Sequence, residues 1–302
     1  MKMITKLEQL RGKAPEGVKR KVSVACPYDF HTLLSLERLR KENRVQAVLV
    51  GLENEISKAA LSCGISLSDY EVCPVNSNDE ALEVAVKKVS SGQADILMKG
   101  LISSEKYLKA VLNRNSGLLT VDSTISHVGV IDNPNLDRLL IFGDAAVLPE
   151  PDLKQKLKIL SSLVQTAVML ENPNPKVALI AATELVSNAI KAGYDASIIA
   201  KMSERGQLDC VADGPLGLDV AINKEASEIK NVRSVIKGDA DCLIFPNIEA
   251  GNAFYKANTK LANSIVASVL SGVKSPVVLT SRADSIESKY YSVLLAIVMG
   301  LN

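Results

Sequence analysis

A serine and an arginine follow a short apolar run near the end of the chain, in "SPVVLTSRADS" (residues 275–285). The run predicts a buried parallel strand, with Ser281 and Arg282 where that strand ends. Arginine is always charged and offers a fork that matches phosphate or carboxylate oxygens, and a neighbouring serine hydroxyl can donate to a developing oxyanion. Both histidines lie far away in the sequence, so neither is placed to activate the serine as a nucleophile. The pattern indicates a site for a negatively charged substrate or, alternatively, a salt bridge from Arg282 to Asp284.

A second candidate site is the segment "KGLISSEKYL", residues 99–108, which follows the strand-like run "ADILM". Ser103 or Ser104 is a natural N-cap for the helix that follows. Free backbone N–H groups, the positive end of a helix dipole and a nearby lysine, Lys99, together favour an anion. The segment therefore predicts an anion site, although an ordinary capped helix would have the same sequence.

The remaining apolar runs also end in small, polar or charged residues, namely Asp144, Thr183, Asp213, Gly214, Asp219, Asn247, Glu249, Gly251 and Asn252. Ligands of open α/β sheets bind outside the carboxyl ends of the strands, so these residues are candidates to line a site. Asp213 and Asp219 could hold a cation, but two carboxylates supply too few oxygens for a hard cation, and we expect no metal. His127 lies in a strand pattern and is expected to be packed and hydrogen-bonded.

The composition excludes several classes of function. The net charge is +1 and only 4% of the 302 residues are aromatic, so neither a nucleic-acid surface nor an anionic-membrane surface is indicated. Five scattered cysteines and two histidines make a Cys/His metal site improbable, and buried free thiols suit the cytoplasm. The charged N-terminus is no signal peptide, and no apolar run approaches the length of a membrane span.

The elements that position these residues alternate between strand and helix. Four βα units are predicted over about the first hundred residues, which indicates a parallel sheet covered by helices. Two adjacent strands, 125–132 and 137–147, then predict an antiparallel pair. The longest helix, 149–171, is expected to bury a stripe of Leu153, Leu157, Leu160, Val164 and Val168. The change of rhythm near residue 125 predicts one α/β domain of residues 1–124 plus 274–302 and a second of residues 125–273.

Six segments together resemble the phosphate acetyl/butyryltransferase family, from about residue 22 to the end of the chain. They are "ADILMKGLISSEKYLKAVL", "SHVGV", "FGDAAVLPEPDLKQK", "RGQLDCVADGPLGLD", "GDADCLIFPNIEAGNAFYK" and "VVLTSRADSIESKYYS". The resemblance implies that acyl-CoA and phosphate are interconverted with acyl phosphate and CoA, with CoA as substrate and no cofactor. "MKG" and "LTSRADS" are more similar to the butyryl branch than to the acetyl branch. The family resemblance also implies two α/β domains flanking a cleft, in an arrangement similar to that of isocitrate and isopropylmalate dehydrogenases.

The resemblance implies roles for individual residues as well. Arg282 would hold the phosphoryl group, and Ser281 would hydrogen-bond the reacting thiol or the oxyanion without being acylated, because transfer is direct in a ternary complex. The residues expected to bind substrates are Lys99, Gly100, Ser103, Ser104, Lys109, Asp213, Gly251 and Asn252. Ser288 stands where the acetyl branch carries an aspartate proposed as the base, and Lys109 stands where that branch has an arginine.

Two alternatives stay open beside a phosphate butyryltransferase. One is a phosphate acetyltransferase, and the other is an NAD(P)-dependent oxidoreductase on the related fold. The oxidoreductase would need a G-x-G-x-x-G motif after a strand and a carboxylate cluster for a metal, and the sequence has neither. The family and the apolar stretch "YYSVLLAIVMG" are consistent with a homodimer or larger, but that stretch could equally be a core helix.

Overall fold

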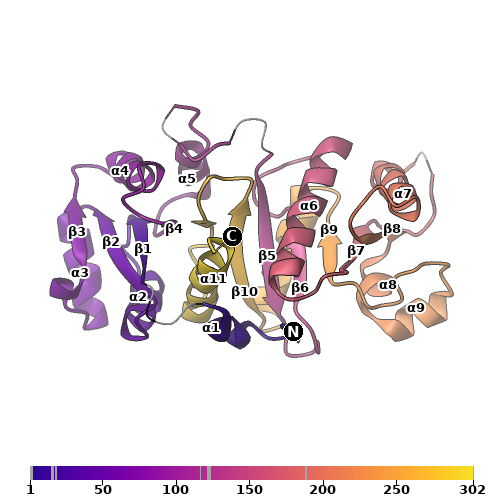
Figure 1. Cartoon of the computed structure of the whole chain (residues 1–302), viewed down its shortest axis with the longest axis horizontal. Helices are drawn as coiled ribbons and strands as arrows, with labels where there is room; N and C mark the ends of the chain where they lie inside the picture. The colour runs from indigo at the N-terminus through magenta and orange to yellow at the C-terminus, as the bar shows by residue number, and fades with distance from the viewer. Residues whose placement is uncertain are drawn as a thin grey trace. The chain divides into compact units, whose positions relative to one another are not determined.

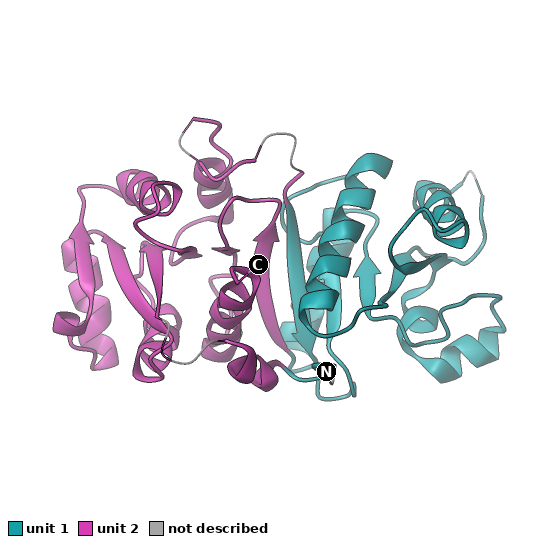
Figure 2. Cartoon of the chain, viewed as in Figure 1, with its two compact units in different colours: residues 1–6, 126–264 teal, residues 7–125, 265–302 magenta. Residues whose placement is uncertain are grey.

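The computed structural model describes residues 3–14, 17, 19–115, 117–120, 124–187 and 189–301 (Figure 1). Contacts divide the chain into two compact units (Figure 2). Unit 1 comprises residues 1–6 and 126–264, and unit 2 comprises residues 7–125 and 265–302. Both units are α/β, which confirms the predicted fold class.

Unit 2 contains a mostly parallel sheet in the order β3-β2-β1-β4-β11-β10. Its strands are β1 (Arg20–Ala25), β2 (Val45–Gly51), β3 (Glu71–Pro74), β4 (Ile96–Lys99), β10 (Ile265–Ser271) and β11 (Val277–Val278). The two-residue β11 pairs in parallel with β4 and antiparallel with β10. The predicted strand before Ser281 is therefore present, but only one of its two neighbours in the sheet is parallel to it.

The helices of unit 2 follow the predicted alternation. They are η1 (Leu7–Gln9), α1 (Leu10–Lys13), α2 (Phe30–Lys41), α3 (Glu53–Cys63), η2 (Leu67–Asp69), α4 (Asn78–Ser90), α5 (Ser104–Val111) and α11 (Ile286–Met299). Four of them, α2, α4, α5 and α11, begin at a capping side chain, because a serine or aspartate oxygen accepts one of the free N–H groups of the first turn. Gly64 ends α3 in the left-handed conformation, as predicted.

The strand order of unit 2 reverses between β1 and β4. The chain runs from β1 outward to β2 and β3, and then returns to place β4 on the other side of β1. Such a reversal marks the usual ligand position in an open α/β sheet. Gly100 follows β4 at this point, where a Cβ would overlap the carbonyl oxygen of Cys26 at the end of β1. Glycine is therefore required for the two chain segments to approach this closely.

Helix α11 is a core element of unit 2. All but three of its residues are buried, and it packs against β10 and α2. The apolar stretch "YYSVLLAIVMG" is thus explained by packing within the unit and carries no argument for an oligomer.

The strands of unit 1 lie in the order β5-β6-β9-β7-β8. Its strands are β5 (Ser126–Asp132), β6 (Leu140–Gly143), β7 (Lys176–Ile180), β8 (Val211–Leu216) and β9 (Cys242–Ile244). β5 and β6 form the predicted antiparallel pair, and the other pairings within the unit are parallel. The helices are α6 (Leu153–Met169), α7 (Lys191–Glu204), α8 (Leu218–Ile222), α9 (Lys224–Lys230) and α10 (Ile248–Lys260).

The predicted apolar stripe of α6 is wrong in its orientation. Leu160 is buried as expected, but Val168 is 50% exposed. The buried residues are Lys156, Ile159, Leu160, Leu163, Thr166 and Ala167. The helix is rotated relative to the leucine stripe because Lys156 faces the interior, where its Nζ lies 2.7 Å from a carboxylate oxygen of Asp195. A buried lysine with a carboxylate partner is tolerated at a position where spacing alone would require an apolar residue.

The two units also divide the chain at different positions from the predicted domains. Residues 265–273 belong to unit 2, because β10 in this segment pairs with β11. The residues before Leu7 belong to unit 1. Strand β10 was not anticipated from the sequence.

Candidate active site

Ser281 and Arg282 lie in a turn that directly follows β11. Leu279 and Thr280 are buried, Ser281 is half-buried, and Arg282 is exposed. The buried carboxylate of Asp284 accepts a hydrogen bond from the Ser281 amide at 2.7 Å, and the Ser281 carbonyl accepts one from the Asp284 amide at 3.2 Å. These two bonds fix the backbone of the turn without using either candidate side chain.

The side chains of this turn remain available for a ligand. Within the part of the chain that the structure describes, Arg282 makes no ion pair, so the alternative of a salt bridge to Asp284 is not observed. The Ser281 Oγ is only a distant acceptor, 3.5 Å from the Ala283 amide, and no described acceptor takes its hydroxyl proton. An exposed guanidinium beside such a hydroxyl can bind an anion and stabilise a developing oxyanion.

Two buried lysines lie beneath this turn. The Nζ of Lys99 donates to the carbonyl oxygens of Gly100 and Thr280, each at 3.4 Å. The Nζ of Lys289, on α11, donates to the Thr280 Oγ1 at 3.4 Å and to the Ser281 carbonyl at 3.5 Å. Burial lowers the pKa of Lys99 to about 8, with smaller contributions from Lys289 and Arg282, and burial also lowers the pKa of Lys289.

The sheet register explains why the ends of β4 and β11 meet. Leu97 and Met98 of β4 pair with Val277 and Val278 of β11 in parallel, so both strands end at the same edge. Lys99 and Gly100 are thereby brought beside the turn that carries Ser281. Sequence reasoning expected Lys99 here but missed Lys289, although a lysine within an otherwise apolar helix was a visible signal.

Helix α5 opens at the same edge of the sheet. Ser103 is its N-cap and accepts from the Lys106 amide at 3.3 Å, which resolves the choice between Ser103 and Ser104. Ser104 is exposed in the first turn, and Lys106 pairs with Asp79 at 2.8 Å. Lys109 is exposed one turn further along. The first turn of α5 thus presents hydroxyl and N–H groups in the way an anion site requires.

Ser288 has a structural role. It is buried, and its Oγ accepts from the Val266 amide at 3.2 Å while its own amide donates to the Ser285 Oγ at 3.1 Å. A serine hydroxyl is a poor base, and this one also joins α11 to β10. The base expected at this position in the acetyl branch is therefore absent, and its function must lie elsewhere.

In unit 1, a buried aspartate organises the end of β6. The Asp144 carboxylate accepts from the amides of Ala146 at 2.7 Å, Val147 at 2.9 Å and His127 at 3.0 Å, and burial raises its pKa. The imidazole of His127 is packed against aromatic rings as expected, and burial lowers its pKa to about 4. Its Nδ1 has no hydrogen-bond partner among the described residues.

Gly251 and Asn252 lie on α10 against the Asp144 loop. A Cβ on Gly251 would overlap the Asp144 carbonyl oxygen, and the Asn252 Nδ2 donates to the Ala145 carbonyl at 3.0 Å. Both residues therefore hold this loop at the carboxyl end of β6.

Asp213 lies within β8, before its carboxyl end. Its carboxylate accepts from the Ser234 Oγ at 2.6 Å and the Val235 amide at 3.3 Å. Asp219 instead pairs with Lys230 at 3.0 Å. The two carboxylates thus have different partners, and the described residues contain no group of three or more His, Cys, Asp or Glu that could hold a metal ion.

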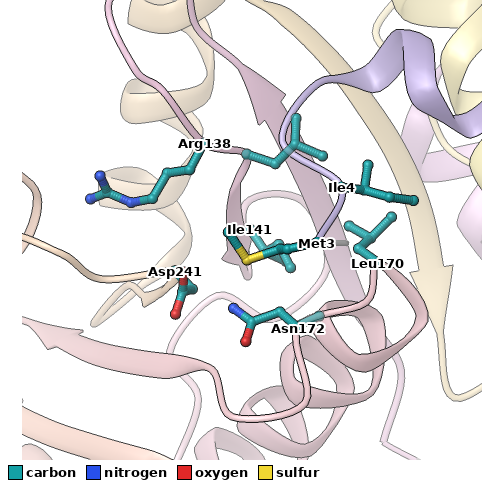
Figure 3. A pocket seen from close by; sticks show the side chains of 9 residues that line it. Met3, Ile4, Arg138, Ile141, Leu170, Asn172 and Asp241 are labelled. Atoms are coloured by element: carbon teal, nitrogen blue, oxygen red, sulfur yellow. The ribbon is translucent and has the colours of Figure 1, made fainter. Parts of the chain in front are cut away.

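A small, mostly apolar pocket of unit 1 is shown in Figure 3. It is lined by residues that include Met3, Ile4, Ile141 and Leu170, with Arg138 and Asp241 among them. Because Arg138 precedes β6 and Asp241 precedes β9, the pocket lies at the amino ends of these strands. Ligands of open α/β sheets bind at the opposite, carboxyl ends, so this pocket lies away from the usual ligand position. Among the described residues, no helix is both long and apolar enough to cross a membrane.

Comparison with known proteins identifies a family. A family model described as "Phosphate acetyl/butaryl transferase" matches residues 75–297. The chain is 39% identical to a phosphate butyryltransferase of Clostridium acetobutylicum, over 99% of this chain and 100% of that protein. It is 38% identical to a phosphate acetyltransferase of Thermotoga maritima, over 97% of each chain.

A solved structure agrees with these similarities. The crystal structure of a branched-chain phosphotransacylase from Enterococcus faecalis matches with a TM-score of 0.80 and 28% identity, covering 93% of this chain and 99% of that one. The family model covers well over half of the chain, and it includes both the β4–α5 turn and the Ser281–Arg282 turn. This chain therefore belongs to the phosphate acetyl/butyryl transferase family.

Proposed function

We propose that this chain is a phosphate butyryltransferase, which interconverts butyryl-CoA plus phosphate with butyryl phosphate plus CoA. The observation that carries the proposal is the exposed Arg282, without an ion pair among the described residues, beside the Ser281 hydroxyl in a member of this family. The relative from Clostridium acetobutylicum bears the same activity in its name, which favours butyryl over acetyl.

The proposed reaction proceeds by direct transfer. A phosphate oxygen attacks the thioester carbonyl carbon, the C–O bond forms, and the C–S bond then breaks to release CoA as a thiolate that takes up a proton. Arg282 holds and orients the phosphate, because its fork matches two phosphate oxygens. Ser281 donates to the oxyanion of the tetrahedral intermediate or to the departing sulfur.

The other expected residues receive supporting roles in this proposal. Gly100, Ser103, Ser104 and Lys109 bind the phosphoryl end of the substrate from the β4–α5 turn, and Lys99 supports this binding from beneath the turn through its charge. Asp213, Gly251 and Asn252 act in unit 1, where their contacts hold loops in place. The two units are proposed to be the two domains of the enzyme.

The test is thiol release from acetyl-, propionyl-, butyryl- and isobutyryl-CoA in the presence of phosphate and a chelator. We expect release with butyryl-CoA to be fastest and to need neither a divalent ion nor a nicotinamide cofactor. Faster turnover of acetyl-CoA would establish the alternative, a phosphate acetyltransferase, which the relative from Thermotoga maritima keeps open. Release that depends on an added metal would contradict the mechanism.

We also propose a homodimer or larger assembly in the cytoplasm, with CoA as substrate and no further cofactor. The support is the family resemblance rather than any exposed face of α11. A monomeric mass by light scattering at micromolar concentration would exclude the oligomer.

A further inference from the structure

Two lysine side chains of unit 2 are buried together around one residue. Lys99 is 1% exposed and Lys289 is fully buried, and both ammonium groups donate to Thr280, one to its carbonyl and the other to its hydroxyl. Lys99 reaches Thr280 from the end of β4, and Lys289 reaches it from α11. The residue that they hold directly precedes Ser281.

The charges of this pair are not balanced by ion pairs. Within the described chain, the acceptors of both ammonium groups are carbonyl and hydroxyl oxygens, and neither lysine lies in a salt bridge. The nearby carboxylates have other donors: Asp284 accepts from the Ser281 amide, and Asp29 accepts from the Thr32 amide and hydroxyl as the N-cap of α2. A buried charge is costly unless it is paired, so an arrangement of this kind needs a reason.

We propose that Lys99 and Lys289 are positioning residues of the acyl-transfer site, which hold the Thr280–Arg282 segment in place and supply the positive charge that a bound phosphate or acyl phosphate requires. This inference rests on the proposed function. Asp29 and Asp284 act on both lysines only as nearby charges, so the bound anion adds to this counter-charge, and Arg282 adds a third cation on the exposed side. The two lysines are not placed in contact with the reacting atoms; they act through the turn and through its charge.

A coupling between anion binding and protonation follows from this arrangement. The groups that face Lys99 are Lys289, Arg282, Asp29, Asp284 and the thiol of Cys26. Tyr107 packs nearby, with its hydroxyl bonded to the Val278 carbonyl and its pKa raised by burial. Burial lowers the pKa of Lys99 to about 8 and also lowers that of Lys289, while it raises the pKa of Cys26 to about 11.

The pKa of Lys99 determines how the affinity for phosphate changes with pH. Without an anion, Lys99 is charged below about pH 8 and neutral above it. A bound phosphate dianion raises the pKa of Lys99, because it stabilises the charged form. Binding above about pH 8 is therefore accompanied by uptake of a proton, and the affinity for phosphate falls by up to about tenfold per pH unit until the raised pKa is reached. Phosphate itself is almost entirely a dianion in that range, so its own titration does not explain such a slope.

The first test uses the unaltered protein. Calorimetric titration with inorganic phosphate at about pH 8.5, in two buffers of different ionisation enthalpy, measures the protons exchanged on binding. We expect uptake of a substantial fraction of one proton. An active enzyme that binds phosphate with no proton exchange would overturn the inference and leave the proposed function intact.

The second test compares variants by the pH profile of the KM for phosphate, measured by thiol release from butyryl-CoA. Lys99→Met should raise this KM on the order of 10²-fold near pH 7 and flatten its dependence above about pH 8. Lys99→Arg, which stays charged, should restore a low KM and also give a flat profile. Lys289→Met should raise the KM and lower kcat, because Thr280 and Ser281 lose a donor. Lys58→Met, at an exposed position on α3, is the matched control and should behave as the unaltered enzyme.

The outcomes separate the inference from the proposed function. Absence of thiol release from every acyl-CoA tested, together with phosphate binding and proton uptake, would remove the function but keep the charged site. A folded Lys99→Met variant with the unaltered KM and the unaltered pH profile would refute the positioning role. If a lysine variant does not fold, as judged by circular dichroism, the proton-uptake measurement on the unaltered protein decides alone.

Discussion

Removal of the Ser281 hydroxyl should lower the catalytic rate with little effect on the stability of the fold. The turn is fixed through its backbone, since the Ser281 amide and carbonyl are both bonded to Asp284, whereas the Oγ makes only the 3.5 Å contact to Ala283. Ser281→Ala should therefore change the free energy of unfolding by less than about 0.5 kcal/mol. Its effect on the chemistry should be much larger, because a donor to a developing oxyanion contributes about 2.7–4 kcal/mol to the transition state.

That contribution corresponds to a loss of about 10²-fold to 10³-fold in kcat, with little change in KM. The assay is thiol release from butyryl-CoA at saturating phosphate, with the thermal midpoint measured on the same preparation. Ser285→Ala supplies the opposite control. The Ser285 Oγ caps α11 by accepting from the Ser288 amide at 3.1 Å, so its loss should lower stability by about 1 kcal/mol and leave kcat unchanged.

A nearly normal kcat in Ser281→Ala, at an unchanged thermal midpoint, would refute the assignment of this hydroxyl to the reaction. A loss of kcat accompanied by a large fall in the midpoint would instead indicate that the side chain supports the turn, against the contacts described above.

Three further predictions concern other positions. Arg282→Ala should raise the KM for phosphate and lower kcat at an unchanged thermal midpoint, and Arg282→Lys should recover only part of the loss; full recovery in steady-state kinetics would argue against a bidentate contact. Gly100→Ala should destabilise the protein by about 1–3 kcal/mol in urea titrations, because the added Cβ meets the Cys26 carbonyl, and an unchanged midpoint would show that the turn can relax. Lys156→Met should cost about 3–5 kcal/mol by the same method, since it leaves Asp195 buried without its partner, and most of that should return in the double variant with Asp195→Leu.

Much of the fold was predictable because its signals are local. Alternating apolar runs and amphipathic stretches predicted the βα units, and Gly64 predicted the end of α3. Strand β10 was missed although Ile265–Ser271 is an apolar run of the same kind, and its pairing with β11 is set by tertiary contacts that the sequence does not display. The stripe of α6 was misplaced because spacing alone does not reveal that Lys156 has a buried carboxylate to meet.

The candidate site was predictable to a similar extent. The sequence placed Lys99 and Ser281 at strand ends, and the parallel pairing of β4 with β11 explains why two distant segments meet. Lys289 could not be assigned in this way, because its role depends on which face of α11 lies under Thr280. The contacts of Asp213 with Ser234 and Val235 were equally invisible, since they join segments that only the folded unit brings together.

The pairing of β11 with β4 has a consequence for co-translational folding. Residues 126–264 of unit 1 form one continuous stretch, whereas unit 2 is interrupted after residue 125 and resumes only at residue 265. A growing chain can therefore fold most of unit 1 before β11, the neighbour of β4, has been synthesised. The segment that is synthesised last contains β10, β11 and α11. The Ser281–Arg282 turn can therefore form only after the rest of the sheet of unit 2 has been synthesised. A nascent chain released early would leave the edge of β4 open to pairing with other chains, and it would lack the Ser281–Arg282 turn.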